Sequence, residues 1–108
     1  NIIINAEYFM TQAHNKGTLT ITTKKQNSSV VISIADDGPG ILPENLRRIF
    51  DPFFTTKKGR RGTGLGLSVS YGIIQEHSGS ISVKSSLGKG TDFIIKLPAL
   101  KVHYEEKR

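Results

Sequence analysis

The stretch Gly62-Thr63-Gly64-Leu65-Gly66-Leu67 lies between a basic segment, residues 57 to 61, and an apolar pattern with helical spacing. Glycines at alternate positions let the backbone turn and approach a ligand closely, because no Cβ atom stands in the way. A helix that begins here would point its free N–H groups and the positive end of its dipole at an anion. The stretch therefore predicts a phosphate-binding loop, with a flexible connection into a helix as the alternative.

The composition limits the classes of protein to which the chain can belong. A length of 108 residues predicts one domain, and we expect neither a membrane span nor a signal peptide. The absence of cysteine excludes a disulfide scaffold and a thiolate zinc site, and it fits a cytoplasmic location. The net charge of +6 is concentrated in residues 57 to 61 and 101 to 108, which argues against a broad nucleic-acid-binding face.

Residues 1 to 14 have the apolar spacing of one buried helical face, and Lys16-Gly17 predicts the end of this helix. Asn1 and Asn5 are four residues apart and therefore share an edge of the helix. Asparagine is a poor helix former, so two stacked amides suggest a binding role; solvated surface positions are the alternative. The chain begins inside this helix without a capping residue, which predicts an N-terminally truncated domain.

Alternating apolar residues predict two strands, 18 to 25 and 30 to 35, joined by a turn at Gln26-Asn27 and buried on one face. The second strand runs into Asp36-Asp37-Gly38-Pro39-Gly40-Ile41. An ionised aspartate only accepts hydrogen bonds, so at the end of a buried strand it suits an exocyclic amine such as that of adenine. The alternative is a simple Asp-Gly-Pro-Gly turn.

The second half of the chain predicts a lid between two helices. A short helix is expected over residues 43 to 49, followed by an aromatic hinge of Phe50, Phe53 and Phe54 packed on the core. Residues 55 to 62, rich in glycine and basic side chains, would form a mobile lid. The next helix would bury Leu67, Tyr71 and Ile74, with Val69 and Ile73 widening its apolar stripe, and would end at His77.

Two further strands are expected around residues 81 to 83 and 93 to 97, with the glycine-rich turn 87 to 91 between them. From residue 99 onward the sequence is polar and charged. We therefore expect the folded domain to occupy residues 1 to 98 and a polar tail to occupy residues 99 to 108.

Five blocks follow one another in a specific order. They are N-x-x-x-N-A at residues 1 to 6, D-x-G-x-G at 36 to 40, F-D-P-F-F-T-T-K at 50 to 57, G-T-G-L-G-L at 62 to 67 and G-K-G-T at 88 to 91. In this order they resemble the catalytic and ATP-binding domain of two-component sensor histidine kinases. The resemblance implies a Bergerat-type α/β (α+β) two-layer sandwich, in which a mixed sheet carries three helices on one face and ATP lies between the helices and the lid.

The resemblance also implies roles for individual residues. Asn5 would coordinate Mg²⁺, with Asn1 supporting the phosphate end. Asp36 would receive the adenine amino group, directly and through water. The compact, mobile cation of Lys57 would approach the γ-phosphate, and Arg60 and Arg61 are lesser candidates. Further contacts to the nucleotide would come from Gly38, Gly40, Ile41, Gly62, Thr63, Gly64, Leu65, Gly66, Leu67 and Thr91.

Two departures from the family pattern affect the expected chemistry. In the gyrase-like and Hsp90-like relatives, a glutamate four residues before the magnesium asparagine activates water. Asn1 holds that place here, and an amide cannot act as a general base, which favours a kinase. Tyr8 stands where the family often has a lysine, so one phosphate contact is missing from the pattern.

No H-E-x-x-x-P phosphoacceptor motif is present, so the phosphate acceptor must lie elsewhere. We therefore expect transfer of the γ-phosphoryl group of Mg·ATP to a histidine on a separate dimerisation helix of the same kinase, which would then phosphorylate a response regulator. A related serine kinase and a non-catalytic nucleotide-binding module are the alternatives. The truncated N-terminal edge predicts possible self-association, and an upstream membrane anchor would be compatible with a cytoplasmic domain.

Overall fold

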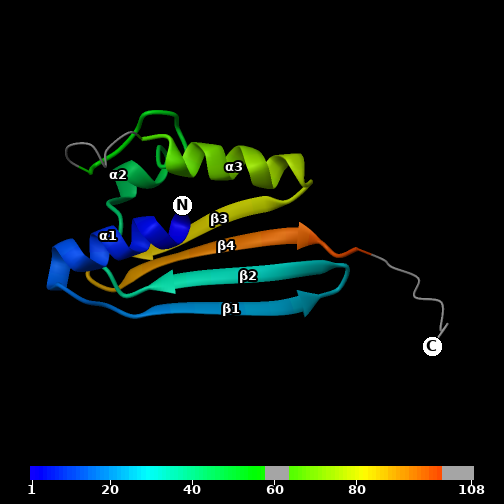
Figure 1. Ribbon diagram of the computed structural model, residues 1–108, viewed down its shortest axis with the longest axis horizontal. Coiled ribbons are helices and arrows are strands. Elements are labelled where there is room, and N and C mark those ends of the chain that lie inside the picture. Colours follow the sequence, from blue (N-terminus) through cyan, green and yellow to red (C-terminus); the bar gives the residue numbers. More distant parts are fainter. Residues whose placement is uncertain (58–63, 101–108) are drawn as a thin grey trace.

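The computed structural model describes residues 1–57 and 64–100, which form a layer of helices over one face of a β-sheet (Figure 1). This arrangement confirms the predicted α+β two-layer sandwich. The elements in chain order are α1 (Ile2–His14), β1 (Leu19–Gln26), β2 (Ser29–Asp36), α2 (Pro43–Leu46), α3 (Gly66–Glu76), β3 (Ser80–Ser86) and β4 (Gly90–Pro98).

The sheet has the strand order β1-β2-β4-β3, and every pair of neighbours is antiparallel. The mixed sheet expected from the family is therefore not formed by the described residues. The reason is that β1 with β2 and β3 with β4 are two hairpins, which join through the antiparallel pair of β2 and β4. This pairing places Asp36 directly opposite Thr91, at the edge of the sheet where β2 ends and β4 begins.

The turn of the first hairpin lies one residue later than predicted. Gln26 pairs with Ser29, so Asn27 and Ser28 form a two-residue turn. Asn27 has a φ of 56°, a left-handed conformation that asparagine tolerates better than most residues. The prediction placed Gln26 in the turn, whereas in the structure it is the last residue of β1.

The core lies between the helices and the sheet. Phe93 at its centre is 2% exposed, and α1 packs on β2 while α3 packs on β3. The buried residues of this cluster are Ile2, Ile34, Ile49, Ile81, Phe93 and Ile95. Because β2 and β4 lie in the middle of the sheet, their ends are the best-supported positions for a binding site.

Strand β1 departs from the prediction of a hairpin with one buried face. Only Leu19 is partly covered, and Ile21 is 52% exposed although it pairs with the buried Ile34. The helices pack on β2 and β3 and leave this edge strand uncovered. The lysines at the end of β1, Lys24 and Lys25, suit such an exposed edge, because charge discourages pairing with another chain.

Two helices end earlier than predicted. Helix α1 ends at His14 rather than at Lys16-Gly17, because Asn15 takes the left-handed conformation (φ 62°) and donates its N–H to Thr11 O at 3.0 Å. Helix α2 ends at Leu46 rather than at residue 49, and the chain continues in tight turns.

In the described ranges, no helix has both the length and the apolar character needed to cross a membrane.

Helix α3 begins at Gly66, inside the glycine-rich stretch that was predicted to open it, and His77 follows its last residue, where the ring Nδ1 lies 2.8 Å from Ile73 O. The predicted wide apolar stripe is wrong. Leu67 and Ile74 pack against the core, but Val69 and Ile73 are 51% and 49% exposed. The sheet contacts only one narrow side of α3. Val69, two residues after Leu67, and Ile73, one residue before Ile74, therefore point outward.

Candidate nucleotide-binding site

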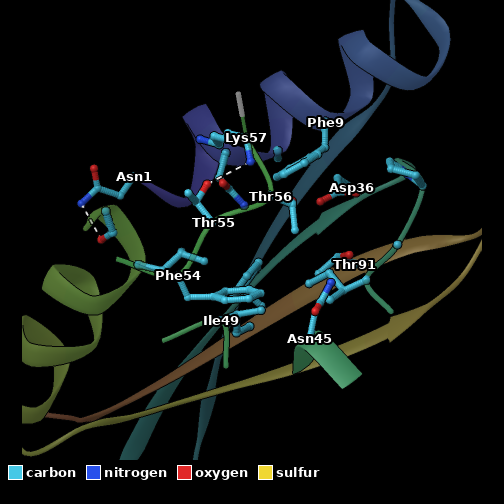
Figure 2. Close-up of a pocket in the computed structure, with 18 of the residues that line it drawn as sticks. Asn1, Phe9, Asp36, Asn45, Ile49, Phe54, Thr55, Thr56, Lys57 and Thr91 are labelled. Atoms are coloured by element: carbon cyan, nitrogen blue, oxygen red, sulfur yellow. Dashed lines mark hydrogen bonds between the residues drawn. The ribbon is translucent and has the colours of Figure 1, made fainter. Parts of the chain in front are cut away.

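A cavity of about 430 Å³ lies between the helices and the sheet, bounded by α1, α2, the start of α3, the end of β2 and the start of β4 (Figure 2). Its volume falls in the range of about 300 to 1,000 Å³ that is usual for small-molecule sites. Most of the predicted site residues meet on its wall. They are Asn1, Asn5, Asp36, Gly40, Ile41, Lys57, Gly64, Gly66, Leu67 and Thr91.

Two predicted contacts lie elsewhere. Gly38 is buried behind the cavity wall, where its N–H donates to Asp36 Oδ1 at 2.9 Å, so it orients the carboxylate instead of facing a ligand. Leu65 is 39% exposed and precedes α3, where its carbonyl accepts the first helical hydrogen bond. The predicted roles of Arg60, Arg61, Gly62 and Thr63 fall outside the described residues.

Asp36 is the only acidic residue on the described wall of the cavity. Burial raises the pKa of its carboxyl group above the usual value, and the neighbouring charge of Asp37 adds to this. The backbone N–H groups of Gly38 and Thr91 act in the opposite direction by stabilising the ionised form. A ligand that donates another hydrogen bond would therefore relieve part of the cost of burying this carboxylate.

A hydroxyl network supports the same end of the cavity. Thr91 is 7% exposed, and its Oγ1 lies 2.9 Å from Ser85 Oγ. Ser85 in turn donates to Gly90 O at 3.0 Å and accepts the N–H of Ile41 at 2.8 Å. Ser85 thus fixes the loop after β2 to the β3–β4 hairpin, a role that sequence reasoning missed because only the strand register brings these residues together.

Gly40 is required by the packing of this loop. Its φ of 79° is left-handed, and a Cβ atom there would overlap the backbone carbonyl of Ser86. A second bond holds the same two loops together, because Gly88 donates its N–H to Pro39 O at 2.9 Å. Gly40, the last residue of the D-x-G-x-G block, therefore allows two loops to meet as well as lining the cavity.

The opposite end of the cavity is built from the N-terminal turns of α1 and α3. The Asn1 side chain donates to Gly66 O at 3.0 Å and to Ser70 Oγ at 3.1 Å, which joins the two helices (Figure 2 shows the bond to Gly66). Asn5 lies one turn further along α1, and its N–H donates to Asn1 O at 3.0 Å. The two asparagines thus share one helical edge at the cavity, as predicted.

Lys57 projects over the aromatic side chains of α1. Its Nζ lies 5.2 Å from the ring centroid of Tyr8 and 6.0 Å from that of Phe9, both within cation–π range. Tyr8 stands at the position where the family resemblance implies a lysine, and its ring contacts the ammonium group of Lys57. The described part of the cavity wall carries two charged side chains, Asp36 at one end and Lys57.

The two ends of the segment between the second helix and α3 are tied together. Phe53 donates its N–H to Gly64 O at 2.7 Å, and a Cβ atom on Gly64, whose φ is 71°, would overlap the backbone of Phe53. Phe50 and Phe54 pack against the core as the predicted aromatic hinge requires. Phe53 does not, because its left-handed backbone (φ 68°) directs the ring outward and leaves it 72% exposed.

Several wall residues were not identified from the sequence. Phe9 could have been found, because it lies one helical turn after Asn5. Asn45 had no such signal: α2 places it on the cavity wall (Figure 2), and no motif marks this position. The remaining members of this group are Ile4, Ala6, Pro39, Leu42, Ile49, Phe54, Thr55, Thr56 and Phe93.

The amide oxygens at the α1 and α3 end of the cavity would suit a magnesium ion that arrives with a nucleotide. The described residues include no cluster of three or more histidine, cysteine, aspartate or glutamate side chains that could hold a resident metal. The available protein ligands are the neutral amide oxygens of Asn1 and Asn5. Mg²⁺ prefers oxygen ligands, keeps several waters and commonly binds through substrate phosphates, so a site with few protein ligands suits it.

Comparison with known proteins identifies the class to which this fold and site belong. The model of the family described as Histidine kinase-, DNA gyrase B-, and HSP90-like ATPase matches residues 1–101, and the chain belongs to this family. Sensor protein SrrB of Staphylococcus aureus (strain NCTC 8325 / PS 47) is 45% identical over 102 residues. The match covers 91% of this chain but 17% of SrrB, so the chain spans about a sixth of that relative.

Solved structures show the same fold. The catalytic domain of histidine kinase ThkA superimposes with a TM-score of 0.69 and 37% identity, over 90% of this chain and 63% of that one. Full-length ShkA in complex with AMPPNP gives a TM-score of 0.73 and 30% identity, over 90% of this chain and 20% of ShkA. The chain is thus similar to the catalytic domains of sensor histidine kinases.

Proposed function

We propose that this domain binds ATP together with Mg²⁺ and transfers the γ-phosphoryl group to a histidine on a separate helical dimerisation domain. One observation carries the proposal. A single cavity has a partly desolvated carboxylate at one end and two amides beside the N-terminus of α3 at the other. An adenine nucleotide has the matching ends, an amino group on the base and a chain of phosphates. The AMPPNP bound to the related ShkA supports this choice.

At the base end, Asp36 would accept a hydrogen bond from the adenine amino group. Guanine presents a carbonyl oxygen at the corresponding position, and two acceptors facing each other are unfavourable. Ile41 and Ile49 line this cavity with apolar surface, which suits the faces of a base. The buried Thr91 hydroxyl would complete the hydrogen bonds on this side, as the family resemblance implies.

At the phosphate end, the first turn of α3 would face the phosphate oxygens with its free N–H groups. Asn5 would hold Mg²⁺, with Asn1 beside it, and the ion would neutralise the charge of the phosphates. Lys57 would add a mobile positive charge near the γ-phosphate. The family roles of Arg60, Gly62 and Thr63 belong to the same proposal.

The choice of acceptor follows from what the described wall lacks. Among the described wall residues, none at the proposed phosphate end carries a carboxylate, since Asp36 lies at the proposed base end. A serine hydroxyl or a water would need such a base to lose its proton, whereas a neutral imidazole already carries a lone pair. Transfer would break the bond between the γ-phosphorus and the bridging oxygen, release ADP and form a phosphorus–nitrogen bond. The chain's part in this is to position the phosphates and offset their charge.

The partners follow from the acceptor. We infer that a helical phosphoacceptor domain of the same kinase docks beside the cavity and that a response regulator receives the phosphoryl group afterwards from that domain. Because ATP is a cytoplasmic substrate, we place this domain in the cytoplasm. Self-association and a membrane anchor elsewhere in the protein remain predictions of the sequence.

Incubation with ATP labelled in the γ-phosphate, Mg²⁺ and a histidine-bearing helical domain tests the proposal. We expect label on the helical domain that is lost in acid and kept in alkali, as for phosphohistidine. Acid-stable label would indicate a serine kinase, and nucleotide binding without transfer to any acceptor would indicate a regulatory module. The Asn5→Ala variant is the control, and it should bind and transfer poorly.

A further inference from the structure

Asn1, Gly66 and Ser70 form a closed set of hydrogen bonds at the phosphate end of the cavity. The Asn1 amide nitrogen donates to Gly66 O at 3.0 Å and to Ser70 Oγ at 3.1 Å. The Ser70 hydroxyl donates its own hydrogen to Gly66 O at 2.9 Å. The two amide hydrogens and the hydroxyl hydrogen are therefore all used, and each has one acceptor.

This set determines which end of the Asn1 amide faces a ligand. A backbone carbonyl only accepts hydrogen bonds, so the nitrogen of Asn1 must lie on the side of Gly66. The oxygen then lies on the opposite side of the amide from the Gly66 carbonyl, as Figure 2 shows. Asn1 is part of the cavity wall, and the oxygen is the end that it can offer there.

The two ends of the amide favour different ligands. Its oxygen attracts a cation, whereas its NH₂ group would donate to a phosphate oxygen. We propose that Ser70 is a positioning residue that fixes the Asn1 oxygen toward the ligand and so makes the site prefer metal-bound nucleotide over metal-free nucleotide. This inference rests on the proposed binding of Mg·ATP.

Ser70 acts through Asn1 and not by contact with the nucleotide. It lies one turn into α3 and is not part of the cavity wall, whereas Asn1 and Gly66 are. Without the Ser70 hydroxyl, one amide hydrogen has no acceptor, and the bond to Gly66 O alone holds the Asn1 amide in this orientation. The NH₂ group, held by one hydrogen bond in place of two, then turns to the phosphates at a lower cost, which favours nucleotide without the metal.

Titration calorimetry on Ser70→Ala tests this, with ATP added once in excess Mg²⁺ and once in EDTA. The measured quantity is the ratio of the two dissociation constants. Loss of the solvent-exposed hydrogen bond between Asn1 and Ser70 removes only its small net free energy, so the preference for Mg·ATP should fall by roughly twofold to fivefold. Affinity for metal-free ATP should be unchanged or higher.

Two matched variants separate positioning from general support of the helix. Ser68 lies on the same helix and its hydroxyl donates to Leu65 O at 2.9 Å, but it does not contact Asn1, so Ser68→Ala should keep the wild-type ratio. Ser70→Thr retains the hydroxyl on a side chain that can still bond the preceding turn, and it should restore the ratio. Circular dichroism melts confirm that each variant is folded.

Equal weakening of both affinities in Ser70→Ala, or an unchanged ratio, overturns the inference. Additive effects of Asn1→Ala and Ser70→Ala on the ratio would also contradict it, because residues that act as a unit are not additive. The proposed function fails separately, if the wild-type chain binds ATP under neither condition.

Discussion

Replacing Asp36 by asparagine removes the acidic group from the base end and changes the cavity very little in shape. The new amide has one oxygen, and the N–H of Gly38 already donates to that position at 2.9 Å. The NH₂ group would then face the adenine amino group, donor against donor. Loss of a hydrogen bond to a charged acceptor costs about 1.5 to 3 kcal/mol, so affinity for ATP should fall by about tenfold to 150-fold.

The stability of the Asp36→Asn variant should move the other way. Burial raises the pKa of Asp36 in the folded state, so the folded protein binds this proton more tightly than the unfolded chain. Its contribution to stability is therefore present at low pH and is lost as the pH rises through the raised pKa. At neutral pH the wild type bears the cost of a buried charge, and the variant should be at least as stable.

Calorimetric titration with ATP and GTP, together with urea unfolding, measures both effects. GTP should bind the variant relatively better, because the amide nitrogen can donate to the guanine oxygen. Asp37→Asn is the control: Asp37 is exposed, lies outside the cavity wall and accepts the N–H of Thr18 at 2.9 Å, so ATP affinity should not change. A variant at Asp36 that binds ATP within twofold of wild type would refute the assignment of the base end.

Three further predictions follow from the same contacts. Affinity for ATP, titrated between about pH 4 and 7, should fall toward low pH starting above the usual aspartate range of about 3.9, and Asp36→Asn should abolish this dependence. Gly64→Ala should lower the free energy of unfolding in urea by at least about 1 to 2 kcal/mol, because Gly64 has a left-handed backbone. The control Gly72→Ala, in open space within α3, should raise it by up to about 1 kcal/mol. Similar effects at both glycines would contradict the assigned strain. Ser85→Ala leaves the N–H of Ile41 without its acceptor and should lower the free energy of unfolding by about 1 to 3 kcal/mol. The control Ser82→Ala, at an exposed position, should lower it by less than about 0.5 kcal/mol. Equal losses in urea unfolding would count against the hydroxyl network.

The order of elements and the two ends of the cavity could be predicted from the sequence. Asp36 follows a strand of alternating apolar residues, and Asn1 and Asn5 are one helical turn apart, so local periodicity places each on a known face. Their meeting in one cavity depended on the family resemblance. Residues such as Ser85 were not predictable, because their partners are set by strand register across the sheet.

The errors have a common physical origin. An apolar residue was expected to be buried wherever its spacing fitted a face, but burial also needs a neighbour. Ile21 on β1 and Val69 on α3 fit the pattern and still face outward, since no described element covers them. Similarly, glycine was expected to end α1 at Gly17, whereas Asn15 ends it two residues earlier with the same left-handed conformation.

The central claim is that one adenine nucleotide spans the cavity with its base at Asp36 and its phosphates at the start of α3. Amide chemical shifts of the isotopically labelled chain, followed during separate additions of adenosine, pyrophosphate with Mg²⁺, and Mg·AMPPNP, test it most directly. We expect adenosine to change the amide chemical shifts of Gly38, Gly40 and Thr91, and pyrophosphate with Mg²⁺ to change those of Asn5 and Leu67. Mg·AMPPNP should change the shifts of both groups and leave those of β1 unchanged. Shifts from adenosine at the α3 end, or none at either end with Mg·AMPPNP, would contradict it.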